Sequence, residues 1–539
     1  MRSHSTFRIK ARAPRGPRTA QLLQTDQDIV RAFLEDAAHY PGGSARGVAF
    51  PRSEADVAAL VRAHERVLPI GAQSSLTGGA TPMGDIVIRT AGLADILDIG
   101  RDAVRVQAGI PFTALQEALD RGRRYYPPVP THDAAFIGGA VATNAAGAAT
   151  FKYGSTRAWV HGLTVVLASG DVLDLARGEV LAHEGRFEVE GTDGRVMAVP
   201  VPGYTMPAVP KRSAGYYAAP GMDLVDLFIG SEGTLGIVTE ATLRVIDRAP
   251  VACLAFVQFS HEGRGLDAVA ALRAASEATW RSGDPAGIDV AGIECLDRRC
   301  LALLREDGHD RKCGVDLPVS TEIALLVQLE LPPGTTAETA FEEIGAVTSS
   351  NAPDTSLVRF CRLLADAGAL DEATLAVPGD RRCADRLLAL REAVPAAVNE
   401  RIGLAQRTLD ATIEKIGADM IVPFAHFADM LQIYREGFER RGLDYAIWGH
   451  ISDGNVHPNV IPRSADDVRA GKDAILEFGR EVIRRGGCPL AEHGVGRNPV
   501  KQALLKQLYG DEGIDEMRAV KRALDPEWKL APGVLFPEP

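Results

Sequence analysis

The fold is indicated first by a run of small residues in the first half of the chain: residues 138–147 read GGAVATNAAG. Two further runs of glycine, hydroxyl and other small residues lie at 71–79 (GAQSSLTGG) and at 230–237 (GSEGTLGI). Such loops bring backbone N–H groups close to a ligand, and these groups bind diphosphate well. None of the runs is a G-x-G-x-x-G after a strand or a G-x-x-x-x-G-K-[ST], so neither a Rossmann fingerprint nor a P-loop is present. Tight turns alone would explain one run better than three in one region, so we favour a nucleotide cofactor bound in another way.

The residues around these loops alternate short β-branched runs with helical stretches from Val48 to Ile246, a pattern typical of an α+β or α/β unit. Ser53 is expected to cap a helix, because Asp56 follows three residues later and Val57, Leu60, Val61 and His64 form one face. Val67–Ile70 is predicted to be a short buried strand that leads into the first loop. A second helix is expected to open at Thr113 and to close at Gly122.

The second half of the chain has a different pattern. From Val251 onward glycine loops become rare, and amphipathic helices alternate with apolar runs such as Ile323–Leu331. This predicts a second domain of sheet and helices.

Length and composition limit the class of protein. A chain of 539 residues is too long for a single small binding module, and 46% hydrophobic with 24% charged residues is close to the average for globular proteins. The formal net charge of −12 repels phosphate backbones, so no nucleic acid is expected as a partner. Small molecules and proteins are better candidates.

The seven cysteines form no Cys-x-x-Cys pair. An odd number in a long chain favours a reducing compartment, and the spacing argues against an iron–sulfur cluster bound by this chain.

The chain shows no apolar run that could span a bilayer and no apolar core of a signal peptide near its start. We therefore expect a cytoplasmic protein with no transmembrane segment, at most peripheral at the inner face of the membrane; a homodimer is left open. The first 25 residues carry several cationic side chains and no acidic one before Asp26. They are expected to form a flexible basic tail, with a targeting signal as the alternative.

The octet 450–457, His-Ile-Ser-Asp-Gly-Asn-Val-His, is the clearest metal signal. Asp453-Gly454 favours a two-residue hairpin turn, which would pair His450 with His457 across the strands on one face. Two imidazoles in that arrangement suit one metal ion, and Glu492 is the candidate third ligand because a His, His, Glu set leaves a position open on Zn²⁺. Two structural histidines are the simpler alternative.

The three glycine-rich runs, with Pro69 before the first and Tyr153-Gly154 after the second, resemble the FAD-binding segments of the vanillyl-alcohol oxidase type flavoproteins. This resemblance implies a two-part PCMH-type FAD-binding domain of α+β class. Members that attach FAD covalently often use a histidine in these loops, where this chain has Gln73 and Ser74, so non-covalent FAD is expected; His132 is the residue that could contradict this. The implied cofactor-binding residues are Gly71, Ala72, Gln73, Ser74, Ser75, Gly78, Pro130, Thr131, Gly138, Gly139, Thr143, Asn144, Gly147, Tyr153, Gly154, Glu232, Gly233, Gly236 and Ile237.

The octet also resembles the H-x-G-D-G-N-x-H motif of the FAD-linked D-2-hydroxyacid dehydrogenases, the family of D-lactate, glycolate and D-2-hydroxyglutarate dehydrogenases. Residues 492–496 (EHGVG) resemble their E-H-G-[IV]-G, and 524–526 (LDP) with 531–534 (APGV) resemble their C-terminal ending. The resemblance implies that His450, His457 and Glu492 bind a divalent metal, for which the ligand set favours zinc, and that His493 is the catalytic base. It also implies that the substrate is bound by Arg391, Lys415 and Asn455.

Two departures from the family pattern stand out. Ser452 replaces the first glycine of the octet. The family's K-x-D-[VL]-S-[VL]-P reads KIGADMIVP from Lys415 to Pro423, longer by about two residues, which makes Lys415 the least secure assignment.

The resemblance implies an FAD-binding domain over 26–250 and a substrate or cap domain of antiparallel sheet and helices over 251–495 that carries the metal site. A C-terminal helical segment over 496–539 would pack back on the FAD domain. The expected function is metal-assisted oxidation of a D-lactate-like D-2-hydroxyacid, with hydride transfer to FAD and an external acceptor such as a quinone, a cytochrome or an electron-transfer flavoprotein. A metallohydrolase and an FAD-binding subunit of a larger redox complex are the alternatives.

Overall fold

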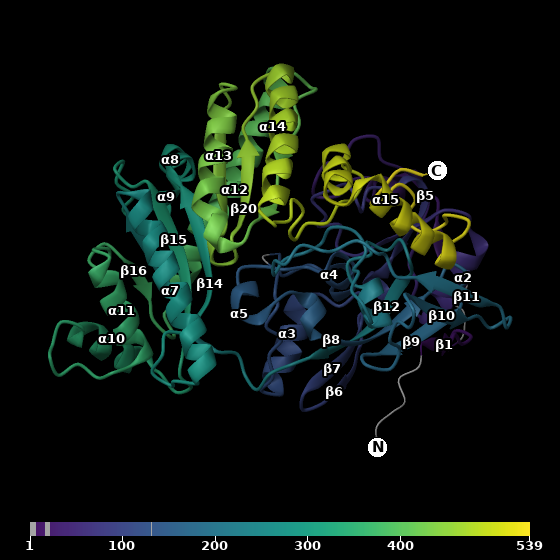
Figure 1. Ribbon diagram of the computed structural model, residues 1–539, viewed down its shortest axis with the longest axis horizontal. Helices are drawn as coiled ribbons and strands as arrows, with labels where there is room; N and C mark the ends of the chain where they lie inside the picture. Colours follow the sequence, from purple (N-terminus) through teal and green to yellow (C-terminus); the bar gives the residue numbers. More distant parts are fainter. Residues whose placement is uncertain (1–6, 17–21, 131, 539) are drawn as a thin grey trace. The chain divides into compact units, whose positions relative to one another are not determined.

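The computed structural model describes residues 7–16, 22–130 and 132–538, and these form two compact units (Figure 1). Unit 1 comprises the described residues of 1–147, 154–249 and 488–539. Unit 2 comprises residues 148–153 and 250–487. The chain therefore leaves unit 1 and returns to it twice.

The first sheet of unit 1 has four strands in the order β2-β3-β5-β4, with bounds Leu23–Gln24, Ser44–Ala49, Met83–Arg89 and Val67–Ile70. Strands β3, β5 and β4 are parallel. Helix α2 (Glu54–Ala63) connects β3 to β4, and the Ser53 side chain caps it by accepting the N–H of Asp56. Both the capped helix and the strand at 67–70 confirm the sequence prediction.

The second sheet of unit 1 is antiparallel, in the order β6-β7-β12-β8-β9: Ile96–Ile99, Ala103–Gln107, Ile237–Arg244, Val160–Val166 and Val172–Ala176. A buried core joins it to the first sheet through residues of α2, β4 and β5 on one side and of β8, β9 and β12 on the other: Val57, Leu60, Val61, Val67, Ile88, Val166, Val172 and Ile237. Two sheets sharing one core form a mixed α and β unit, in agreement with the predicted α+β class.

The helices of unit 1 include α1 (Gln27–Arg31), α3 (Phe112–Arg121), α4 (Ile137–Thr143), α6 (Leu224–Phe228) and α15 (Pro499–Leu524). Helix α3 closes at Gly122 as predicted, but it begins at Phe112 and has no side-chain cap. Helix α4 carries the glycine pair of the run at 138–147.

Part of the basic N-terminal segment, for which the sequence predicted a flexible tail, contributes a short strand to unit 1. Strand β1 (Arg8–Lys10) pairs with β10 (Arg186–Glu190), which in turn pairs with β11 (Val196–Pro200). Arg12 forms ion pairs with Glu54 at 2.7 Å and with Asp174 at 2.5 Å. The positive charge of Arg12 is thus neutralised by acidic residues far away in the sequence.

The C-terminal residues close unit 1. The N–H of Val67 donates to Lys529 O at 2.9 Å, and the N–H of Ala531 donates to Val67 O at 2.8 Å. In the LDP motif, the Asp525 carboxylate accepts hydrogen bonds from Lys521 Nζ and from the N–H of Leu530, each at 2.8 Å. The LDP motif is therefore structural. The chain re-enters unit 1 at Cys488, whereas the sequence placed the boundary between 495 and 496, so Glu492 and His493 lie in unit 1.

Unit 2 is built on one sheet in the order β16-β13-β15-β14-β19-β20-β17, with β18 also paired to β20. The strands are Thr374–Ala376, Val251–Phe259, Ile323–Leu331, Val290–Asp297, Tyr445–His450, Asn455–Val460, Ile416–Gly417 and Met420–Ile421. The recorded pairings are antiparallel. The apolar run predicted at 323–331 is thus the buried strand β15.

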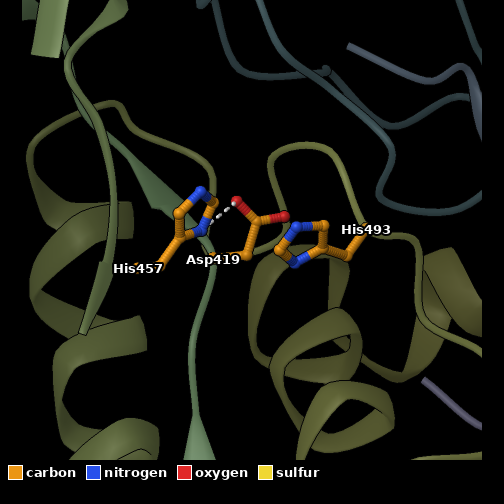
Figure 2. A group of neighbouring side chains, drawn as sticks. All are labelled: Asp419, His457 and His493. Carbon is orange, nitrogen blue, oxygen red and sulfur yellow. Dashed lines mark ion pairs between the residues drawn. The ribbon is translucent and has the colours of Figure 1, made fainter. Parts of the chain in front are cut away.

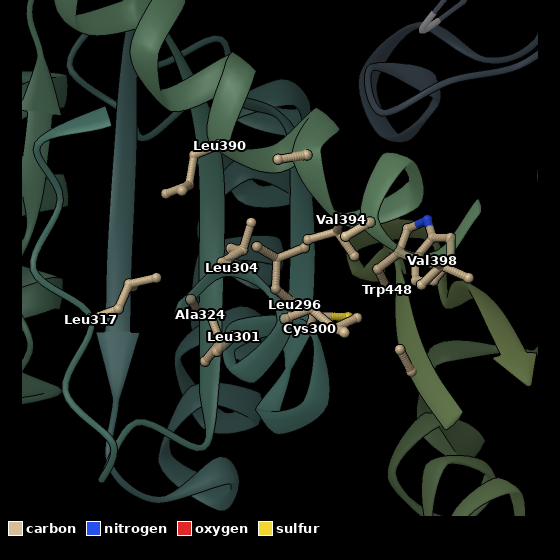
Figure 3. Packing of buried hydrophobic residues seen from close by; sticks show 14 of the residues in the cluster. Leu296, Cys300, Leu301, Leu304, Leu317, Ala324, Leu390, Val394, Val398 and Trp448 are labelled. Carbon is tan, nitrogen blue, oxygen red and sulfur yellow. The ribbon is translucent and has the colours of Figure 1, made fainter. Parts of the chain in front are cut away.

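The helices of unit 2 are α5 (Thr150–Tyr153), α7 (Glu262–Ser282), α8 (Arg298–Glu306), α9 (His309–Cys313), α10 (Ala337–Ala346), α11 (Ser356–Asp366), α12 (Arg381–Thr408), α13 (Phe427–Glu439) and α14 (Ala465–Arg484). Helix α12 packs Leu390, Val394 and Val398 into a core with Leu296 of β14 and Trp448 of β19 (Figure 3). This packing fixes the helix turn that carries Arg391.

All seven cysteines are buried free thiols. Among the described residues, none of the helices combines the length and apolarity needed to cross a membrane.

Candidate active site

A cavity of about 280 Å³ lies within unit 1, where the three glycine-rich runs meet. Its walls include most of the predicted cofactor-binding residues: Gly71, Ala72, Gln73, Ser74, Ser75, Pro130, Gly138, Gly139, Thr143, Glu232, Gly233, Gly236 and Ile237. His132, Glu492 and His493 line the same cavity. Runs that are far apart in the sequence therefore converge on one space, which supports a ligand site over isolated tight turns.

The cavity needs small residues for two different reasons. A Cβ on Gly138 would lie 2.7 Å from Ala108 Cβ, and a Cβ on Gly236 would lie 2.4 Å from Val165 Cγ1, so these glycines permit close packing. A Cβ on Gly139 would meet no atom within 4 Å, so this glycine faces open space in the cavity wall. A nucleotide lying against the backbone at Gly139 fits this geometry.

Of the predicted cofactor-binding residues that the structure describes, five are not found in the cavity wall. Gly78 packs against Tyr40, Asn144 caps α4 in the left-handed conformation, and Tyr153 belongs to unit 2, where its hydroxyl donates to Glu330 at 2.7 Å. Gly147 and Gly154 are likewise absent from the lining, and Thr131 lies outside the described residues. Gln73 lines the cavity, but its side-chain amide donates to Phe33 O and Ala80 O, so it stabilises the loop.

The loop that carries Glu492 and His493 is held inside unit 1. Lys211 Nζ lies 3.0 Å from Glu492 Oε2, and His493 Nε2 lies 3.5 Å from Glu492 Oε1. The Glu232 carboxylate accepts the N–H groups of Val495 at 2.7 Å and Gly496 at 2.8 Å. Because Lys211 is fully buried, the Glu492 carboxylate has a buried counter-charge.

Glu232 is expected to make the protein less stable as the pH rises. Burial raises the pKa of its carboxyl from 4.5 to about 7, and the hydrogen bonds from Val495 and Gly496 offset this only in part. An acid that binds protons more tightly in the folded state lowers the free energy of unfolding as the pH rises from the unfolded to the folded pKa, here from 4.5 to about 7. The full effect is about 3 kcal/mol.

Urea unfolding of the FAD-saturated protein across this pH range measures the effect. Glu232→Gln is expected to remove most of this decline in stability. Parallel pH profiles for the wild type and the variant would contradict the role of Glu232.

The histidine octet in unit 2 does not form the predicted two-residue turn. Strands β19 and β20 pair Trp448 with His457, and residues 451–453 form a short 3-10 turn that ends at Gly454 with a φ of 81°. The predicted pairing of His450 with His457 is therefore wrong. The two imidazoles are nevertheless neighbours, with ring centroids 5.6 Å apart and planes at 90°.

Each imidazole faces a buried carboxylate of unit 2. His450 Nδ1 lies 3.2 Å from Glu294 Oε1, because β14 and β19 place these two residues directly opposite each other. His457 Nδ1 lies 3.5 Å from Asp419 Oδ1 (Figure 2). Burial alone would raise the pKa of Glu294, but the charges of Arg391 and His450 outweigh burial and hold this pKa well below its usual value.

The three predicted substrate-binding residues have different surroundings. Arg391 is buried, and its Nη2 lies 3.1 Å from Glu294 Oε1. Asn455 is buried, and its Nδ2 donates to Asp419 Oδ1 at 3.0 Å. Lys415 has an exposed side chain just before β17. Arg391 and Asn455 thus lie beside the histidine cluster.

Comparison with known families identifies the chain. The model of the C-terminal domain of FAD linked oxidases matches residues 265–535, which is just over half of the chain. The chain belongs to the FAD-linked oxidase family. A model of an FAD binding domain matches residues 45–176 of this FAD-linked oxidase, the part that contains the first two glycine-rich runs. FAD as cofactor, the enzyme class and the predicted family resemblance are confirmed.

Two curated relatives extend over most of this FAD-linked oxidase. Glycolate oxidase subunit GlcD of Bacillus subtilis (strain 168) is 29% identical over 87% of this chain and 83% of its own length. D-2-hydroxyglutarate dehydrogenase of Xanthomonas citri pv. viticola is 29% identical over 91% of this chain and 89% of its own length.

A solved structure supports the fold. 4-Ethylphenol oxidase from Gulosibacter chungangensis, in an isoeugenol complex, has a TM-score of 0.62 at 16% identity, covering 96% of this chain and 95% of that chain. At this level of identity the similarity concerns the fold alone.

Sequence reasoning missed three buried charged residues of this FAD-linked oxidase: Lys211, Glu294 and Asp419. Asp419 had a signal, since Asp419 and Pro423 keep the spacing of the Asp and Pro in the family's K-x-D-[VL]-S-[VL]-P. That spacing puts Gly417 at the position of the family's lysine. A Cβ there would lie 2.3 Å from Asn459 Oδ1, so a side chain would require Asn459 to move.

Filling the space in front of Gly139 is expected to weaken FAD binding. Gly139→Leu should place a side chain in the cavity, because the glycine has no neighbour within 4 Å. We expect the Kd for FAD, measured by fluorescence titration of the apoprotein, to rise at least about tenfold. A loss of about 1.4 kcal/mol of binding free energy is sufficient for a tenfold increase in Kd.

Gly345→Leu is the matched control, because Gly345 lies in helix α10 of unit 2 and its Cβ would also meet no atom within 4 Å. This variant should bind FAD as the wild type does. Tight FAD binding by Gly139→Leu would exclude the unit 1 cavity as the FAD site.

Proposed function

We propose that this FAD-linked oxidase oxidises a D-2-hydroxyacid to the corresponding 2-oxoacid with the help of a divalent metal ion, zinc being our first choice. The observation that carries this proposal is the pair of perpendicular imidazoles of His450 and His457, each with its Nδ1 beside a buried carboxylate. The names of the relatives support the substrate class, since both describe enzymes of 2-hydroxyacids.

The donor set fits a divalent metal. A carboxylate beside Nδ1 stabilises the tautomer that carries the proton there, which leaves the Nε2 lone pair as the metal-binding donor. We propose His450, His457 and Glu492 as the three ligands. Imidazole and carboxylate ligands suit Zn²⁺ and also other first-row divalent ions.

The cofactors supply the two parts of the chemistry that side chains lack: when bound, FAD accepts the hydride and the divalent cation makes the substrate hydroxyl more acidic. The chain supplies orientation and proton transfer. The planar guanidinium of Arg391 can bind the substrate carboxylate, because Glu294 contacts it through Nη2 and the group carries five N–H donors. Its orientation decides which face of the substrate carbon is presented.

His493 is proposed as the general base. It lies in the wall of the FAD cavity of unit 1, beside Glu492. An imidazole nitrogen of His493 accepts the hydroxyl proton, as a positioned general base. We further propose an external electron acceptor that reoxidises the flavin.

Anaerobic mixing with a panel of D- and L-hydroxyacids tests the proposal. Bleaching of the flavin absorbance by glycolate or by a D-2-hydroxyacid such as D-lactate or D-2-hydroxyglutarate, and its loss after chelation, is the expected result. A yellow protein that no hydroxyacid bleaches would instead be an FAD-binding subunit without substrate chemistry. A colourless, metal-containing protein would point to a hydrolase.

A further inference from the structure

Two buried carboxylates of unit 2, Glu294 and Asp419, lie beside the proposed metal ligands without being ligands themselves. Their exposed fractions are 8% and 1%. Burying a carboxylate is costly unless charged or hydrogen-bonding groups compensate it. Their partners therefore indicate what these carboxylates are for.

Glu294 contacts one proposed metal ligand and one proposed substrate-binding residue. Its Oε1 lies 3.2 Å from His450 Nδ1 and 3.1 Å from Arg391 Nη2. The three residues come from β14, β19 and α12, and the sheet register places Glu294 directly opposite His450. One carboxylate thus fixes an imidazole and a guanidinium together.

Asp419 makes the equivalent pair of contacts at the other histidine. Its Oδ1 lies 3.5 Å from His457 Nδ1 and accepts a hydrogen bond from Asn455 Nδ2 at 3.0 Å. Asn455 and His457 are two residues apart on β20, so their side chains lie on the same face of the strand. The same arrangement of one carboxylate, one imidazole and one further polar side chain therefore occurs twice in unit 2.

The physical effect of such a carboxylate on a metal-binding histidine is general. It fixes the tautomer and the orientation of the ring and makes the other nitrogen a better ligand. A guanidinium or an amide held by the same carboxylate loses its freedom to rotate, so its position depends on the same group. A change in the position of the metal ligand then also changes the position of the substrate-binding residue.

We propose that Glu294 and Asp419 are positioning residues, each of which links one metal-binding histidine to one substrate-contacting side chain, so that metal binding and substrate binding are coupled. This inference rests on the proposed function, because it assigns a metal to the histidines and a substrate to Arg391 and Asn455. A carboxylate that served only as a counter-charge for Arg391 would affect stability without affecting metal affinity.

The test compares Glu294→Gln and Asp419→Asn with the wild-type FAD holoenzyme. Zn²⁺ affinity is measured by competition with a chromogenic chelator, and KM and kcat by anaerobic flavin reduction with the hydroxyacid that bleaches the wild type best. Both variants are expected to bind Zn²⁺ about 10- to 100-fold more weakly. Glu294→Gln is also expected to raise KM about tenfold or more, because Arg391 loses a charged partner.

Comparing the effects on kcat and on KM shows whether the two carboxylates are positioning or catalytic residues. With saturating Zn²⁺ and substrate, kcat of both variants should return to within about tenfold of the wild type, since neither carboxylate is assigned to the reacting atoms. Glu294→Asp, which keeps the charge on a shorter side chain, should fall between the wild type and Glu294→Gln in both affinity and KM.

Asp297→Asn is the matched control. Asp297 is a buried carboxylate on the same strand as Glu294, but it accepts the N–H groups of Cys300 at 2.8 Å and Ile447 at 3.0 Å. This variant should keep the wild-type Zn²⁺ affinity and KM to within about twofold, since it leaves the contacts of Glu294 with His450 and Arg391 in place.

Unchanged Zn²⁺ affinity and unchanged KM in variants that retain FAD would overturn the inference. If Glu294→Gln does not fold, Glu294→Asp and Asp419→Asn decide in the same way. A wild-type protein that binds no Zn²⁺ and is bleached by no hydroxyacid would refute the proposed function itself, which is a different result.

Discussion

Replacing His493 with alanine is expected to leave a yellow protein whose flavin is no longer reduced by the hydroxyacid. The base accounts for about 10²- to 10⁴-fold of the rate in enzymes of this kind, so flavin reduction should slow by that factor. FAD should remain bound, because most of the cavity wall is formed by the three glycine-rich runs. Single-turnover absorbance under anaerobic conditions measures the rate.

The control for this variant is His161→Ala, which removes an exposed histidine of unit 1 on strand β8. It should reduce its flavin at the wild-type rate. Reduction of the His493→Ala variant within a factor of about three of the wild type would refute the assignment of His493 as the base, since one proton-transfer step is worth far more.

Replacing His457 with alanine is expected to remove the metal and most of the activity. The variant would keep one imidazole and one carboxylate as ligands, and such a pair binds Zn²⁺ poorly. The zinc content measured by mass spectrometry should therefore fall from about one per chain to near zero. Loss of several kcal/mol of charge stabilisation corresponds to a rate of flavin reduction about 10³-fold lower. The flavin spectrum should not change.

His426→Ala is the control here, because His426 is an exposed histidine of the same unit. It should retain zinc and activity. Full zinc occupancy in His457→Ala would show that the metal, if present, is bound elsewhere. Full activity in a zinc-free wild type would show that the oxidation proceeds without it.

The cofactor site could be predicted from sequence because its signal is local. Each glycine-rich run shows by itself that the backbone approaches a neighbour or a ligand closely, as at Gly138, Gly139 and Gly236. The sequence prediction also included residues outside the cavity wall, because a glycine such as Gly78 serves packing as readily as ligand binding. Spacing alone does not distinguish these two uses.

The histidine hairpin shows how a wrong register can still lead to the correct neighbours. The predicted pairing and the observed one differ by two residues, and a shift of two keeps every side chain on its face of the sheet. The register depends on β14, which pairs with β19, and on Gly454, whose Cβ would lie 2.3 Å from Val422 O. Neither contact can be read from the octet.

Glu294 was not predicted because its partners are far away in the sequence. It lies 97 residues from Arg391, and only the strand order β14-β19-β20 brings it opposite His450. No local pattern marks a buried glutamate in an apolar strand as a partner of a metal ligand. The assignment of Glu492 and His493 to the second domain failed for a related reason, since the return of the chain at Cys488 has no composition change.

The hydrogen bonds between Val67 and residues 529–531 have a consequence for the synthesis of the protein. Strand β4 gains these partners only when residues 529–531 have left the ribosome, whereas almost all of unit 2 is a continuous stretch from 250 to 487. Unit 2 can therefore complete its sheet during translation, before the unit 1 residues that precede it can pair with residues 529–531. A nascent chain that ends early would expose the apolar side of this first segment, so chaperones and proteases should act on such truncated products and spare the finished protein.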